Sequence, residues 1–150
     1  MMGHIPGGGD DVVEKHWGDP NRSQPREVFG RGEVATAMVW LSVAALASLL
    51  IEIAYLGTWV ELGAFAVPLP WTIPAAYVVN LILTRTALLW TENRTLAAVP
   101  LGAWTIGFGL VLLWAALPAG GDQLLGNGLR TIGLLAAGII GGGWPLRHPK

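Results

Sequence analysis

The chain contains no cysteine and few charged residues. Without cysteine it has no disulfide, thiolate metal site, iron–sulfur cluster or cysteine nucleophile. Charged types make up 13% of its 150 residues, which is about half the share of an ordinary soluble domain. The net charge of −1 leaves no basic surface for nucleic acid, and apolar types reach 53%. These proportions exclude a soluble globular domain, a disordered chain and a nucleic-acid-binding protein.

The few charges are unevenly distributed along the chain. Ten of the 19 charged residues lie in the first 33 positions, together with the run Gly7-Gly8-Gly9 and three prolines. Such a segment cannot bury enough apolar surface to offset the entropy lost on ordering. Residues 1–33 are therefore predicted to be a charged tail that is disordered alone and orders on a partner. Residues 34–150 hold the other nine charges and are predicted to form a membrane domain.

Four apolar runs have the length that a bilayer requires, roughly 20 helical residues. They do not alternate as strands do, and backbone groups in lipid must be satisfied internally. The sequence therefore predicts an all-α integral membrane protein with four transmembrane helices. The predicted spans are about 34–56, 67–90, 96–117 and 124–144. Prolines at 68, 70 and 74 interrupt the start of the second run, which predicts an apolar loop or short interfacial segment over 57–69.

Lysine and arginine fall on one side of this arrangement. The tail, the connection between the second and third spans and the C-terminal end contain eight of these cations. The other two connections contain none, only Glu61 and Asp122. Because cations are enriched on the cytoplasmic side of membrane proteins, both termini are predicted to face the cytoplasm. The expected location is the bacterial cytoplasmic (inner) membrane, as a multi-pass protein.

Two ionisable residues lie in apolar surroundings, Glu52 near the end of the first span and Arg130 near the start of the fourth. At 1.5 Å per residue both would lie roughly 6–9 Å below the outer interface. Glu52 follows Ala44 and Ser48 at helical spacing, and Arg130 shares a face with Gly133. Small residues let helices approach, and buried charges in membranes usually pair. The pattern favours an ion pair between Glu52 and Arg130. Separate contacts with headgroups, or with a partner protein, stay as alternatives.

Small residues on the third and fourth spans predict close helix contacts. The residues expected to mediate this packing are Gly102, Gly107, Gly109, Gly133, Ala137 and Gly141.

Groups that would carry catalysis are missing from the predicted spans. All three histidines, at positions 4, 16 and 148, lie in the predicted tails. Asn80 is the one other strongly polar side chain inside a span, so a proton relay of Asp, Glu or His across the bilayer lacks parts. The sequence predicts no catalytic residue, no metal site and no cofactor.

The stretch from Val99-Pro100-Leu101-Gly102-Ala103-Trp104 through Leu117-Pro118-Ala119-Gly120-Gly121-Asp122 and on to Gly138 resembles a known group. It is similar to small four-helix actinobacterial membrane proteins of unknown function. In these proteins a helix with proline, small residues and tryptophan precedes a proline-x-glycine-aspartate turn and a glycine-rich last helix. The resemblance implies a turn role for Asp122 and no further site residues.

A second resemblance is to small multidrug transporters, which are also four-helix proteins with one glutamate in the first span. Glu52 would be that residue, behind Ala44, Ala45 and Ser48. Three features depart from the pattern: the one-sided charge bias, the placement of Glu52 near the outer interface, and the long charged tail.

Two functions follow from these observations. The first is a non-catalytic accessory or assembly subunit of a larger respiratory or cell-envelope complex, acting through helix packing and tail docking. Its partners would be other membrane subunits and lipid. The alternative is a small proton-coupled transporter in which Glu52 exchanges protons for substrate, which predicts a homodimer. Whether the accessory protein also self-associates is left open.

Overall fold

The computed structural model describes residues 29–56, 59–62, 65–68, 71–118, 120–121, 124–125 and 128–148. The predicted tail lies outside this part of the chain up to residue 28. The elements in chain order are α1 (Arg31–Tyr55), β1 (Trp59–Leu62), β2 (Phe65–Pro68), α2 (Thr72–Trp90), α3 (Arg94–Ala97), α4 (Val99–Leu113), the 3-10 helix η1 (Trp114–Ala116) and α5 (Leu129–Arg147).

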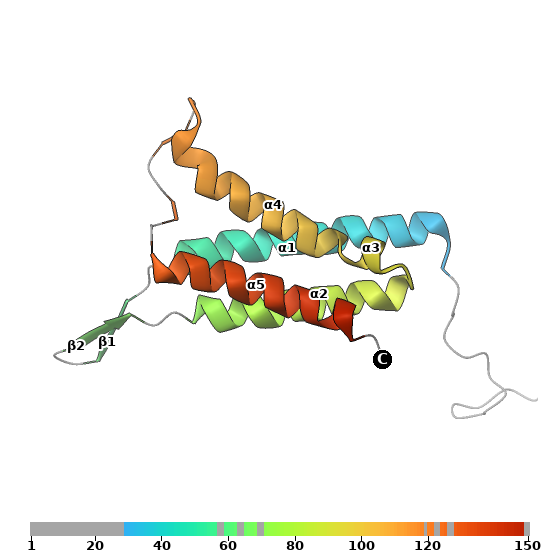
Figure 1. Ribbon diagram of the computed structural model, residues 1–150, viewed down its shortest axis with the longest axis horizontal. Coiled ribbons are helices and arrows are strands. Elements are labelled where there is room, and N and C mark those ends of the chain that lie inside the picture. The colour runs from blue at the N-terminus through green and yellow to red at the C-terminus, as the bar shows by residue number, and fades with distance from the viewer. Residues whose placement is uncertain are drawn as a thin grey trace, which may run out of the picture.

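The long helices form one bundle whose chain direction alternates (Figure 1). The start of α1, the α2–α3 connection and the end of α5 lie at one end, the α3 end. The two strands and the connection from η1 to α5 lie at the other, the hairpin end. The main packing pairs are α2 with α5, α1 with α4, and α1 with α2. Each of the first two pairs runs parallel, so the bundle is two parallel helix pairs laid against each other.

Three helices, α1, α2 and α5, are long and apolar enough to cross a membrane. α4 is a shorter apolar helix of 15 residues, or about 22 Å at 1.5 Å per residue. α3 and η1 continue its helical course at either end. Pro100 in the first turn of α4 accounts for the break from α3, because proline has no N–H and its ring crowds the preceding turn. These helices confirm the coarse prediction of a helical body with apolar helices that could span a membrane.

The predicted interfacial segment contains strands that the sequence analysis did not expect. β1 and β2 pair antiparallel, with Trp59 opposite Pro68 and Leu62 opposite Phe65. The segment was interpreted from the length and hydropathy of its apolar run, and these properties do not show whether two short stretches pair as strands. Pro68 ends the second strand, consistent with its lack of an N–H donor. The second span accordingly starts at Thr72 rather than at 67.

The first and fourth spans also start away from their predicted positions. α1 starts at Arg31, three residues early, because the Glu33 carboxylate accepts a 2.7 Å hydrogen bond from the Gly30 N–H and caps the helix. α5 starts at Leu129, five residues later than predicted. Four glycines between positions 120 and 128 disfavour helix there, since glycine loses the most backbone freedom on folding.

The bundle interior has one main apolar cluster and a smaller one toward the α3 end. The main cluster comprises Ala45, Leu49, Leu56, Ala76, Trp104, Phe108, Leu125 and Leu134. The smaller cluster comprises Met38, Ala87 and Ala97. Trp104 and Phe108 are the largest fully buried side chains, so α4 supplies the bulk at the centre.

Candidate functional site

Glu52 lies in the bundle interior near the hairpin end of α1, and only 3% of its surface is exposed. Its Oε2 accepts a 3.0 Å hydrogen bond from the indole Nε1 of Trp104, while its Oε1 has no hydrogen-bond partner. Trp104 is fully buried and stacks on Phe108, with ring centroids 5.5 Å apart. A Cβ added to Gly138 of α5 would overlap the Trp104 ring. The indole therefore lies between Glu52 on α1 and the backbone of α5.

This arrangement differs from the predicted pair of Glu52 and Arg130. The partner that the structure gives to Glu52 is Trp104, and no donor reaches Oε1. Two facts explain the difference. α1 packs chiefly against α4 and α2 rather than against α5. Because α5 starts at Leu129, Arg130 is the second residue of that helix rather than one well inside it.

A buried polar stripe runs along α2, formed by Thr72, Asn80 and Thr84 at helical spacing with Ala76 between them. All three polar side chains are at most 1% exposed. Asn80 Nδ2 donates to the Ala76 carbonyl at 3.0 Å, but Asn80 Oδ1 and both threonine hydroxyls have no hydrogen-bond partner. Buried polar atoms are nearly always paired. Of these three side chains, only Asn80 was singled out from the sequence. The four-residue spacing of the threonines from Ala76 and Asn80 was the signal that could have revealed the stripe.

Three of the glycines predicted to mediate packing lie at helix contacts. A Cβ on Gly141 would overlap the backbone carbonyl of Tyr77, so α2 and α5 approach there without intervening side chains. A Cβ on Gly107 would lie 2.8 Å from a Leu46 methyl, and one on Gly133 would lie 3.1 Å from a methyl of Ile73. Small residues thus allow the α1–α4 and α2–α5 contacts, as expected for membrane helices.

The other predicted packing residues behave differently. A Cβ on Gly102 or on Gly109 would meet nothing within 4 Å, so neither glycine mediates close packing within the chain. Ala137 is half-buried. Gly142, which was not singled out, does mediate a contact, since its Cβ would lie 2.5 Å from a Leu101 methyl. Whether a small residue mediates a helix contact therefore depends on which side of its helix faces the bundle.

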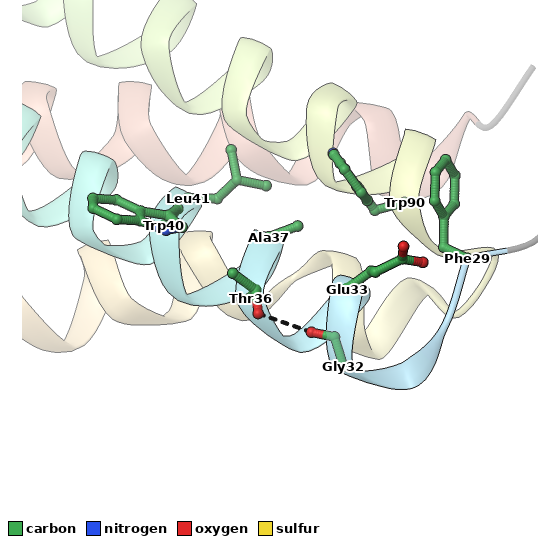
Figure 2. Close-up of a pocket in the computed structure, with 8 residues that line it drawn as sticks. All are labelled: Phe29, Gly32, Glu33, Thr36, Ala37, Trp40, Leu41 and Trp90. Atoms are coloured by element: carbon green, nitrogen blue, oxygen red, sulfur yellow. Dashed lines mark hydrogen bonds between the residues drawn. The ribbon is translucent and has the colours of Figure 1, made fainter. Parts of the chain in front are cut away.

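A groove of about 810 Å³ opens on the side of the bundle at the α3 end. Its lining residues are Phe29, Gly32, Glu33, Thr36, Ala37, Trp40, Leu41 and Trp90. Figure 2 shows Glu33, Phe29 and Trp90 together at one end and Trp40 with Leu41 at the other. The Phe29 and Trp90 rings pack at 4.7 Å, so the segment that leads into α1 contacts the end of α2. The surface is aromatic and apolar, with a single carboxylate.

Within the described ranges, no group of three or more His, Cys, Asp or Glu side chains could hold a metal ion. His148 packs its ring against Trp144 at 5.2 Å. The other two histidines and Asp122, with its implied turn role, lie outside the described residues, and Glu61 lies in β1.

No protein-family model, curated protein or solved structure matches the chain.

We expect Glu52 and Trp104 to be energetically coupled. In a double-mutant cycle of Glu52→Leu and Trp104→Phe, measured by unfolding in detergent, the two losses should be non-additive by about 1 kcal/mol or more, because one hydrogen bond is removed by either change. Additive losses would show that the hydrogen bond is absent.

A second double-mutant cycle combines Glu52→Leu with Arg130→Leu. Non-additive losses in that cycle would support the ion pair predicted from the sequence.

Proposed function

We propose that the chain is a non-catalytic accessory or assembly subunit of a larger complex in the bacterial cytoplasmic membrane, respiratory or cell-envelope. The observation that carries the proposal is the pair of open glycines on α4. Gly102 and Gly109 lie seven residues apart, with the exposed Ile106 between them, and a Cβ added to either would meet nothing within 4 Å in the described chain. Seven residues are close to two helical turns, so both glycines lie on one face of α4, and small residues on such a face let a second transmembrane helix approach.

Two further features support this proposal. α4 diverges from the other helices toward the hairpin end (Figure 1), and Leu110, Leu112 and Leu113 are exposed there. The groove at the α3 end lies where the tail enters α1, and its aromatic side chains suit the docking of a partner segment. In this proposal α4 binds a partner helix, while the tail and the groove bind the same complex at the membrane surface.

The cation positions support an orientation with both termini in the cytoplasm. Arg31 starts α1, Arg94 starts α3 and Arg147 ends α5, and all three of these points lie at the α3 end. Arg130 lies at the start of α5, at the hairpin end. In the proposed orientation the α3 end faces the cytoplasm, since cations concentrate on that side.

The proposal is tested by purification from native membranes. A tag on the C-terminus at the chromosomal locus, mild detergent extraction and mass spectrometry should identify a stoichiometric set of membrane partners. Gly102→Leu combined with Gly109→Leu should reduce that recovery severalfold, because the added side chains keep the partner helix away. Gly143→Leu is the matched control, since Gly143 is also an open glycine but lies on α5.

Recovery of the chain alone, as a small homo-oligomer, would overturn the proposal. The same holds if the α4 double variant and the Gly143→Leu control recover partners equally. Thermal unfolding of each variant shows whether a loss of partners reflects a lost interface or a lost fold.

A proton-coupled transporter is the second candidate function, and one observation favours it. Glu52 is buried beside a neutral indole and its Oε1 has no hydrogen-bond partner, so the structure does not commit this carboxyl to a cation. The transporter predicts a homodimer and proton movement that depends on Glu52. The native-membrane purification separates it from the accessory subunit.

A further inference from the structure

Four buried polar atoms without hydrogen-bond partners lie on the facing helices α1 and α2. They are Glu52 Oε1, Thr72 Oγ1, Asn80 Oδ1 and Thr84 Oγ1. The parent side chains are all more than nine-tenths buried. A membrane interior offers no bulk water to compensate such atoms, and an ionisable residue there points to function. All four atoms are buried on two helices that pack against each other, and this calls for a chemical role.

The register of the two helices sets the depth of Glu52 relative to the polar stripe of α2. The rings of Tyr55 and Trp71 pack at 5.8 Å, which sets the ends of α1 and α2 level. Depth along the bundle axis can be counted from the hairpin end at 1.5 Å per residue. On this count Glu52 lies about 3 Å deeper than Thr72, and Asn80 lies about 9 Å deeper than Glu52. Thr84 lies one further turn toward the α3 end. Polar side chains thus lie on both sides of the carboxyl.

We propose that the polar stripe of α2 is a proton-access route to Glu52 and that Oε1 of Glu52 is the atom that binds the proton. Trp104 Nε1 already donates to Oε2, so Oε1 is the oxygen left for a proton. A threonine hydroxyl both donates and accepts a hydrogen bond, so it can pass a proton or orient a water molecule, and the Asn80 carbonyl can hold a water molecule in line. This inference is independent of the accessory-subunit proposal and of any partner, and it names the proton route that the second candidate function would use.

The step is a proton transfer and nothing else. A hydronium ion at an end of the bundle gives up its proton, which passes through water and hydroxyl oxygens to Oε1. The carboxylate becomes a carboxylic acid and the hydronium ion becomes water. Only O–H bonds form and break, so no oxidant, reductant or other reactant is needed.

Few other titratable groups on the packed helices compete for this role. α4 carries none, and α2 carries Tyr77 and Arg85 away from the buried stripe. α1 carries the exposed Tyr55 one turn beyond Glu52, and it carries Arg31 and Glu33 in its first turn at the α3 end. α5 carries Arg130 in its first turn and Arg147 in its last. Within the described helices, Glu52 is the buried carboxyl that the stripe can serve.

The test is infrared spectroscopy of the full chain in lipid vesicles, from acid to alkaline pH. A carboxylic acid C=O band should appear in the wild type and be absent from Glu52→Gln. On transfer to D₂O this band should shift as O–H becomes O–D. The combined variant Thr72→Val, Asn80→Leu and Thr84→Val should slow the shift at least tenfold, because the route loses its polar atoms on both sides of Glu52. Thr105→Val is the matched control, since that hydroxyl already donates to the Leu101 carbonyl within its own helix at 2.9 Å.

Two results would overturn the inference. One is the absence of any Glu52-dependent acid band at every pH where the protein stays folded. The other is a deuterium shift equally fast in the wild type and in the stripe variants. If Asn80→Leu does not fold, Thr84→Val alone and Thr72→Val serve, because valine keeps the shape of threonine without its hydroxyl. Neither readout depends on recovering a partner, so this inference and the proposed function can fail separately.

Discussion

Trp104→Ala should lower the free energy of unfolding by about 3–5 kcal/mol, the range seen when a large buried aromatic side chain is truncated. Trp104 is 0% exposed, stacks on Phe108 and lies against Gly138 of α5. Its removal leaves a cavity between three helices and takes from Glu52 its indole donor. Chemical unfolding in detergent, followed by circular dichroism, measures the loss.

The matched control for this change is Trp40→Ala. Trp40 is 69% exposed on α1, so the same truncation there should change the unfolding free energy by about 0.5 kcal/mol or less. The loss of unfolding free energy for Trp104→Phe should lie between these two values, since phenylalanine keeps most of the aromatic bulk but cannot donate the hydrogen bond. A loss for Trp104→Ala within 1 kcal/mol of the Trp40→Ala value would refute the central placement of the indole.

Gly141→Ala is the second change with a large expected effect. The added methyl group would overlap the backbone carbonyl of Tyr77, and a backbone atom cannot move aside unless α2 moves with it. The α2–α5 pair should therefore separate, at a cost of about 1–3 kcal/mol typical of overpacking. Because α2 and α5 are among the main packing pairs of the bundle, the melting temperature should fall as well.

The run of three glycines at 141–143 provides its own control. Gly143→Ala meets nothing within 4 Å, so it should leave stability unchanged or raise it by up to about 1 kcal/mol through better helix propensity. The loss of stability for Gly142→Ala should lie between these two, since its methyl group would meet the Leu101 side chain, which is flexible and can rotate away. Equal effects at positions 141 and 143 would contradict the observed rotation of α5 against α2.

Several features of the fold followed from local properties of the sequence. The helical nature of the body and its apolar helices follow from run length and hydropathy, because a bilayer admits few alternatives. Three of the predicted packing glycines, Gly107, Gly133 and Gly141, do lie at contacts. The hairpin of β1 and β2 was not predicted, because the composition of that segment does not distinguish a hairpin from a loop.

The candidate site was only partly predictable. The sequence identified Glu52 as an unusual carboxyl, because a charge in an apolar run is conspicuous at any rotation of the helix. It did not identify Trp104, 52 residues away, since tryptophans in membrane proteins are mostly expected at the interfaces. The predicted partner Arg130 depended on the residue at which α5 begins, and helix starts in glycine-rich segments are weakly specified.

By itself the sequence determined which segments are apolar enough to lie in a membrane and where the charges gather, because these properties belong to each segment alone. The tertiary structure decided which faces of those segments meet. It selected Gly107 over Gly109 as a packing residue, brought Trp104 to Glu52 and turned Thr72, Asn80 and Thr84 inward. A helix in an apolar medium has no strongly polar side to specify its rotation, so the rotation is set by close packing against its neighbours.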